Sequence, residues 1–246
     1  MLEKALEEFN KYVENYDNKV EGINLKYNHS LVVMDLMGEL AFRLGLDNEK
    51  IELAKVIGLL HDIGRFEQFK LYNEYSDRKT NFDHANYGAD YLFKEGNIRN
   101  FIEDSKYDNI IEKAIRNHNK YQIEDGLSKE ELLFSKMIRD MDKVDILKQD
   151  VIHFDVEFKA SEVTEEVLKN FKEEKSIELK FVKTKTDMTL VTLAFIFDFN
   201  FNESFDILVE TDNFDLYLSM VNVSEDSEKL WKKIREVCFD KINRGL

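Results

Sequence analysis

The sequence contains no proline, one cysteine and only nine glycines in 246 residues. Strands joined by tight turns need more proline and glycine than this, so the composition favours an all-α fold of helices and short polar loops. The single cysteine, Cys238, excludes an intramolecular disulfide and a zinc site built from several cysteines. We expect Cys238 to be a small buried residue of a late helix.

Long apolar runs are also scarce, and the 35 basic residues are outnumbered by 50 acidic ones. The longest apolar stretch, near residues 190–197, is too short to cross a bilayer as a helix, and the first residues lack the layout of a signal peptide. These absences predict a cytoplasmic protein that does not enter a membrane. The net charge of −15 argues against a DNA, RNA or anionic membrane surface. A small anionic substrate remains compatible, since a metal site reverses the local field. The sequence does not define the oligomeric state.

Apolar residues recur at helical spacing along most of the chain. The predicted helices cover about 2–16, 28–44, 48–61, 81–96, 98–104, 108–118, 128–150, 164–171 and 224–240. Residues 17–26 are predicted to be a loop, and 66–79 a polar, aromatic loop that could close over a site. The stretch 190–201 fits a buried helix in its first half and a strand in its second, and we favour the helix. Ser128 and Glu131 form a capping-box pattern.

We expect one domain over residues 1–246. A core of about 25–150 carries the candidate site, and a helical C-terminal subregion of about 151–246 packs on it, because no flexible linker or repeat separates the two.

The stretch 56–65 contains the most informative pair of residues. Its apolar run ends in His61 and Asp62, followed by Gly64 and Arg65. On a helix, His61 shares a face with the apolar Ile57 and points where the helix buries its side chains. A carboxylate at the edge of a buried face is costly unless it is paired or bound to a metal. For this pair alone, a hydrogen-bonded core histidine is the alternative.

Four of the five histidines fall on apolar or small-residue faces of four separate predicted helices: His29, His61, His84 and His118. Asp142 does the same on a fifth helix. Inward imidazoles and carboxylates are costly one by one, whereas gathering them around a cation satisfies them together. The fifth histidine, His153, has no matching pattern, and we expect it to be packed or hydrogen-bonded.

This pattern resembles the HD superfamily of metal-dependent phosphohydrolases over about residues 25–150. The family's elements are a first histidine, an adjacent His-Asp pair and a distant aspartate, which match His29, His61-Asp62 and Asp142. His84 and His118 look like the two further histidines of members that bind two metals. The resemblance implies an HD-domain helical bundle around one or two divalent transition-metal ions. The mixture of imidazole and carboxylate ligands suits Mn, Fe, Co, Ni or Zn and does not choose among them.

The resemblance also implies a division of roles. Asp62 would bridge two metals, with His29, His61 and Asp142 on one and His84 and His118 on the other. Water activated by the metals would then cleave the phosphate ester of a nucleotide or a related small phosphorylated substrate. The Gly-Tyr-Pro tract of the branch that cleaves cyclic dinucleotides is absent, which argues against cyclic di-GMP as the substrate.

Three basic residues are candidates for binding that substrate. Arg65, which we expect to act in catalysis with Asp62, is placed to reach a phosphate, although many relatives have a lysine there. Lys120 and Lys143 are weaker candidates, and for all three the alternative is a solvated surface charge. Tyr72 and Tyr75 are close enough in sequence to meet the substrate.

Two other functions stay open. A branch of the same superfamily uses the same six-ligand set around two irons as an oxygenase. A non-catalytic nucleotide-binding or partner-binding module with a structural metal is the other, and the complete ligand set argues against it.

Overall fold

The computed structural model describes residues 1–17, 19–152 and 159–245, and these are mostly helical. The described strands are β1 (Lys159–Ala160) and β2 (Asn222–Val223), which form one short parallel pair. The predicted all-α class is therefore confirmed. The chain divides into two compact units, Met1–Asp142 and Lys143–Leu246. Packing of a C-terminal subregion on the core within a single domain stays a prediction.

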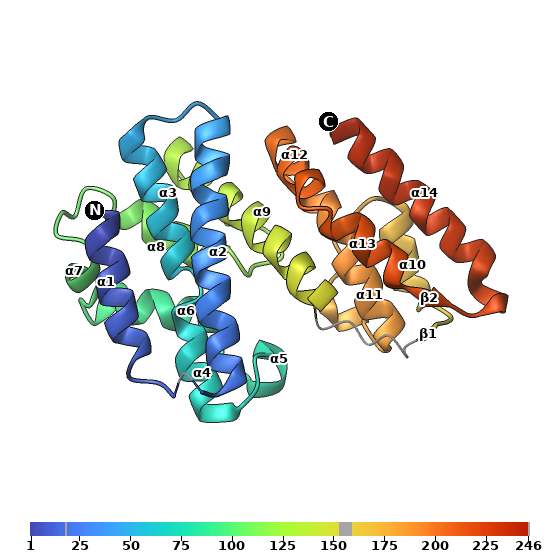
Figure 1. Ribbon diagram of the computed structural model, residues 1–246, viewed down its shortest axis with the longest axis horizontal. Helices are drawn as coiled ribbons and strands as arrows, with labels where there is room; N and C mark the ends of the chain where they lie inside the picture. The colour runs from blue at the N-terminus through green and yellow to red at the C-terminus, as the bar shows by residue number, and fades with distance from the viewer. Residues whose placement is uncertain (18, 153–158, 246) are drawn as a thin grey trace. The chain divides into compact units, whose positions relative to one another are not determined.

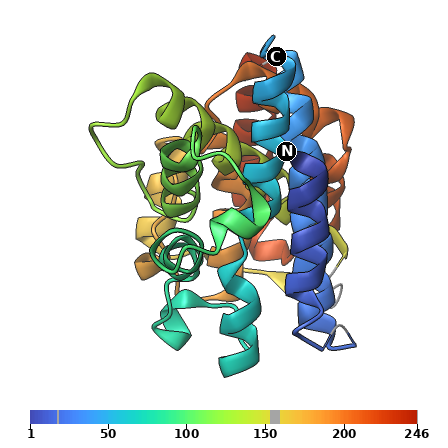
Figure 2. The same cartoon turned by 90° about the vertical axis from the view of Figure 1, so that its left-hand side faces the viewer.

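The N-terminal unit is a helical bundle (Figure 1). Helices α2 and α3 lie side by side, α1 packs against α3, and Figure 2 shows α1 in dark blue along this pair. The helices of this unit are α1 (Leu2–Val13), α2 (Glu21–Arg43), α3 (Asn48–Leu60), α4 (Gly64–Tyr72), α5 (Asp77–Thr80), α6 (His84–Ala89), the π-helical η1 (Asp90–Lys94), α7 (Ile98–Phe101), α8 (Asp108–Asn117) and the first part of α9 (Lys129–Ile152).

At Gly58 the backbone of α3 lies directly against the backbone of α2. A Cβ atom built on Gly58 of α3 would lie 2.7 Å from the carbonyl oxygen of Val33 in α2, so only glycine fits there. His29 is one turn before Val33, and His61 is one turn after Gly58. The close approach therefore brings these two histidines together.

Two predicted loops are wrong in part. Helix α2 begins at Glu21, with Gly22 in its first turn, whereas residues 17–26 were predicted to be a loop. Of the second predicted loop, 66–79, residues 66–72 belong to α4 and residues 77–79 belong to α5. The period of α4 is hidden in the sequence because the polar Gln68 is fully buried beside Phe66, while the apolar Leu71 is exposed.

The ends of the helices follow local side-chain chemistry. Asp47 caps α3 by accepting a hydrogen bond from the backbone of Lys50, as its position favours. The Ser128–Glu131 capping box is confirmed, since each residue's backbone N–H donates to the other's side chain, at 2.7 and 3.3 Å. Helix α6 begins after Asp83, later than the predicted start at residue 81, because Asn81 has left-handed backbone that ends α5.

The C-terminal unit contains the remainder of α9, the β1–β2 pair and a set of mostly short helices: α10 (Glu165–Lys172), η2 (Leu179–Phe181), α11 (Lys185–Leu193), η3 (Ala194–Asp198), α12 (Asn202–Glu210), α13 (Asn213–Met220), η4 (Glu225–Ser227) and α14 (Glu228–Gly245). The predicted helices at 164–171 and in the last segment are confirmed. Residues 190–198 are helical, as favoured, and the backbone becomes extended at Phe199. Cys238 is fully buried in α14, and burial raises the pKa of its thiol to about 12.

His153 lies outside the described residues. No described helix is both long enough and apolar enough to cross a membrane.

Candidate metal centre

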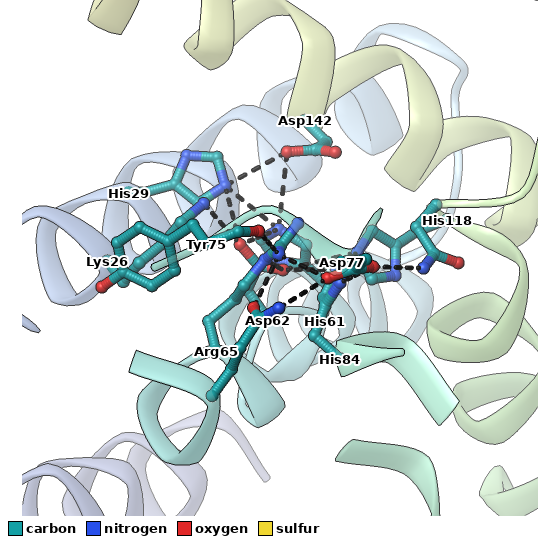
Figure 3. Close-up of polar contacts among 12 residues, drawn as sticks. Lys26, His29, His61, Asp62, Arg65, Tyr75, Asp77, His84, His118 and Asp142 are labelled. Carbon is teal, nitrogen blue, oxygen red and sulfur yellow. Dashed lines mark hydrogen bonds and ion pairs between the residues drawn. The ribbon is translucent and has the colours of Figure 1, made fainter. Parts of the chain in front are cut away.

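Six side chains from five segments of the N-terminal unit point toward one another (Figure 3). They are His29 of α2, His61 and Asp62 of the turn after α3, His84 at the start of α6, His118 directly after α8, and Asp142 of α9. The first five are at most 6% exposed. The Asp142 side chain is 16% exposed. The structure brings together all six residues that the sequence singled out.

The Asp62 carboxylate divides the cluster into two halves. Its Oδ2 atom lies 3.5 Å from Nε2 of His29 and 3.7 Å from Nε2 of His61. Its Oδ1 atom lies 3.2 Å from Nε2 of His84 and 3.4 Å from Nε2 of His118. We call His29, His61 and Asp142 the first half, and His84 and His118 the second half. Asp142 belongs to the first half because its Oδ1 is 3.1 Å from Nε2 of His29.

The hydrogen bonds of the imidazoles direct lone pairs into the cluster. Nδ1 of His61 and Nδ1 of His118 each lie 2.7 Å from a backbone carbonyl oxygen, and Nδ1 of His84 lies 2.6 Å from a carboxylate oxygen of Asp77. These acceptors assign the proton to Nδ1, which leaves a lone pair on each Nε2. The Nε2 atoms of His84 and His118 are only 3.0 Å apart. Two facing lone pairs repel unless a cation or a proton lies between them, so the donor set fits a metal ion.

Both carboxylates of the cluster are in the ionised form that a metal needs. Burial by itself raises the pKa of Asp62, but the Lys26 ammonium, 2.8 Å from Oδ2, and the neighbouring imidazoles hold that pKa well below its usual value. Burial likewise opposes ionisation of Asp142, and contacts with His29 and His61 hold its pKa well below the usual value.

Lys26 is a site residue that the sequence analysis missed. Its side chain is 15% exposed and its ammonium reaches the buried cluster. The residue falls in the segment predicted to be a loop. Once α2 is known to begin at Glu21, the spacing of Lys26 and His29 places both on one helical face, which was the available signal.

Asp77 of α5 is the second residue missed, and no sequence pattern marks it. Its carboxylate receives the Nδ1–H of His84, with further donors from Arg65 at 2.8 Å, Gln68 at 2.9 Å and Asn119 at 3.3 Å. Burial raises the pKa of Asp77, but the contact with His84 and the charge of Arg65 outweigh it and keep the pKa below its usual value.

The three predicted substrate-binding residues differ in their surroundings. Arg65 lies against the cluster: its Nη1 donates to Asp77, Gln68 and the carbonyl of Tyr75. Its Nε is buried, has no hydrogen-bond acceptor among the described residues, and lies 3.5 Å from Oδ1 of Asp62.

The ammonium of Lys120 is held by Glu124 at 2.8 Å. The ammonium of Lys143 is held by Asp198 at 2.5 Å within the C-terminal unit. Substrate binding by all three stays a prediction.

The backbone positions of His84 and His118 are set by close packing at Gly64 and by the buried Arg139. A Cβ atom on Gly64 of α4 would lie 2.2 Å from the carbonyl oxygen of His84, so α4 and α6 touch at this point. Arg139 of α9 donates to the carbonyl of Asn117 at 3.2 Å and to that of His118 at 3.5 Å. These bonds satisfy carbonyl groups at the end of α8 and hold the backbone of His118.

The HD domain family model matches residues 27–184, well over half of the chain, and the chain therefore belongs to the HD domain family. This is a superfamily of the metal-dependent phosphohydrolase type whose domains bind divalent metals. The matched segment contains all six clustered side chains, and three overlapping groups of them could hold a metal ion. No curated protein and no solved structure matches the chain significantly.

Proposed function

We propose that this protein is a metal-dependent phosphohydrolase that cleaves the phosphate ester of a small molecule such as a nucleotide. One observation carries the proposal: three buried imidazoles direct their Nε2 lone pairs at the ionised carboxylate of Asp62. A cation among these Nε2 atoms would satisfy their lone pairs together, and imidazole with carboxylate is a ligand set for divalent transition metals.

The two halves support two metal sites that share Asp62. His29, His61, Asp142 and Oδ2 of Asp62 would hold one ion, and His84, His118 and Oδ1 of Asp62 the other. Divalent ions held there supply an activated water and polarise the phosphoryl oxygens.

The residues around Asp62 support an anionic substrate. Lys26 lies against Oδ2 of Asp62 and Arg65 lies near Oδ1, so the shared carboxylate has a cation on each side in a strongly acidic protein. Nε of Arg65 is buried beside Oδ1 of Asp62, so the guanidinium adds positive charge to the centre while Nη1 keeps its hydrogen bonds.

Tyr75 fits a supporting role better than stacking on a nucleobase. Its hydroxyl donates to the carbonyl of Gly22 at 2.6 Å, the Lys26 ammonium lies 5.5 Å from the centre of its ring, and burial raises the pKa of its phenol. We assign Tyr75 to fixing Lys26 and the segment before α5. Tyr72 is 48% exposed and remains a candidate for contact with the substrate.

A diiron oxygenase is the second candidate, favoured by the convergence of all six side chains that this branch of the superfamily uses. Elemental analysis of the purified protein, followed by a phosphate-ester screen with the metal supplied, tests the proposal. We expect one or two equivalents of a transition metal and metal-dependent release of phosphate. Oxygen consumption by the iron-loaded protein without phosphate release would favour the oxygenase, and a protein that binds no metal would overturn both.

A further inference from the structure

We propose that Asp77 is a positioning residue that sets the metal affinity of the second half, so that the two halves bind metal unequally. This inference rests on the proposed metal-dependent function. It concerns a residue outside the six clustered side chains, in a segment that the sequence marks with no pattern.

The imidazoles differ in the group that accepts their Nδ1 proton. Of His61, His84 and His118, only His84 gives its Nδ1 proton to a carboxylate, at 2.6 Å from Oδ2 of Asp77. The other two give it to backbone carbonyls. A carboxylate makes the stronger, charge-assisted hydrogen bond, fixes the ring orientation and makes the opposite nitrogen a better metal ligand.

The two halves also differ in the number of groups that could bind a metal. The first half contains a carboxylate of its own, Asp142, in addition to the shared Asp62. The second half contains two imidazoles and the shared Asp62. A cation lies beside each half: the Lys26 ammonium is 2.8 Å from Oδ2 of Asp62, and Nε of Arg65 is 3.5 Å from Oδ1. By the number of donor groups, the second half is the weaker metal site. Asp77 supplies a further negative charge to it from behind His84.

Hydrogen bonds from two other side chains hold the Asp77 carboxylate in place. Its Oδ1 accepts from Nη1 of Arg65 and from Nε2 of the fully buried Gln68. Nη1 of Arg65 also holds the carbonyl of Tyr75, two residues before Asp77. The carboxylate is therefore fixed on the Nδ1 side of His84, and the affinity of the second half depends on that placement.

The test is a titration of metal-stripped full-length protein with Co²⁺, followed by calorimetry and by the visible absorption of the bound ion. We expect the wild type to take up two equivalents. Asp77→Asn, which keeps the shape and removes the charge, should leave the first equivalent unchanged and weaken the second roughly 10–100-fold. Asp90→Asn is the matched control, since Asp90 is a carboxylate of the same unit paired with Arg116 at 2.6 Å. It should bind both equivalents as the wild type does.

Arg65→Met provides a second, independent variant. Removing a positive charge near the centre would by itself strengthen metal binding, whereas releasing Asp77 would weaken the second equivalent. We expect the second equivalent to weaken. The melting temperature of each metal-free variant, compared with that of Asp90→Asn, reports whether the fold is intact.

Several results would overturn the inference. They are an unchanged second equivalent in Asp77→Asn, an equal loss of both equivalents, a strengthened second equivalent in Arg65→Met, or a wild type that takes one ion unaffected by Asp77→Asn. A wild type that binds no Co²⁺ would instead overturn the proposed function, so the two failures are distinguishable.

Discussion

The ammonium of Lys26 lies 2.8 Å from Oδ2 of Asp62, the carboxylate shared by both halves of the candidate centre. The protein thus provides its own cation at the point where a divalent ion would bind. In the metal-free state this pair offsets part of the cost of burying an ionised carboxylate.

Replacement of Lys26 by methionine should therefore destabilise the metal-free protein by about 3 kcal/mol, because it leaves a buried charge without its partner. Added metal should restore much of this loss, so the metal-induced rise in melting temperature should be larger in the variant than in the wild type. Lys11→Met, at an exposed ion pair on α1, is the control. Equal metal-induced shifts in the variant and the wild type would contradict this role of Lys26.

Asp62→Ala should abolish activity and lower the metal content, since it removes a ligand from both halves at once. Elemental analysis and a phosphate-release assay check this. His153→Ala is the control, because His153 is the histidine that no ligand pattern includes, and its metal content should equal that of the wild type. An unchanged stoichiometry in Asp62→Ala would argue against the bridging role.

Glu124 should make a measurable contribution to stability that depends on pH. Hydrogen bonds from Lys113 and Lys120 lower the pKa of this carboxylate from its usual 4.5 to about 2. A lowered folded-state pKa stabilises the folded protein above the unfolded value, and this contribution is lost as the pH falls from about 4.5 toward about 2.

We therefore expect Glu124→Gln to reduce the free energy of unfolding by about 1 kcal/mol at pH 7. The difference from wild type should shrink as the pH falls below 4.5. Denaturant melts between pH 7 and pH 3.5 measure it, with Asp125→Asn as the exposed neighbouring control. A difference that stays constant through this range would show that the ion pairs are not its source.

Gly58→Ala should weaken metal binding although the residue is no ligand. Its Cβ atom would meet the backbone of α2 at 2.7 Å, and such overpacking costs about 1–3 kcal/mol. Separating α2 from α3 also moves His29 away from His61, so calorimetry should detect a lower affinity for the ion of the first half. Metal affinity equal to that of the wild type would show that the cluster tolerates this displacement.

The six clustered side chains could be predicted because each lies on the buried face of a periodic segment, where imidazoles and carboxylates stand out against apolar neighbours. Helix α4 could not be predicted in the same way. Its buried face contains Gln68, whose amide is satisfied by Asp77 and Thr80 from elsewhere in the chain. A polar residue of this kind hides the period until its tertiary partners are known.

Lys26 and Asp77 show two different limits of sequence analysis. Lys26 was missed because the start of α2 was predicted too late in the chain. The glycine in the first turn of that helix made the segment look like a loop. Asp77 was hidden because its role exists only through contacts with Arg65, Gln68 and His84, which local periodicity does not encode.

The backbone contact between Gly64 and His84 limits how this centre could be built into another protein. A Cβ atom on Gly64 would lie only 2.2 Å from the carbonyl oxygen of His84. Any side chain at this position would therefore push His84 away from His61 and Asp62. A designer who transplants the six clustered side chains into another bundle must therefore also place a glycine at this position, or accept a wider spacing between His84 and the His61–Asp62 pair.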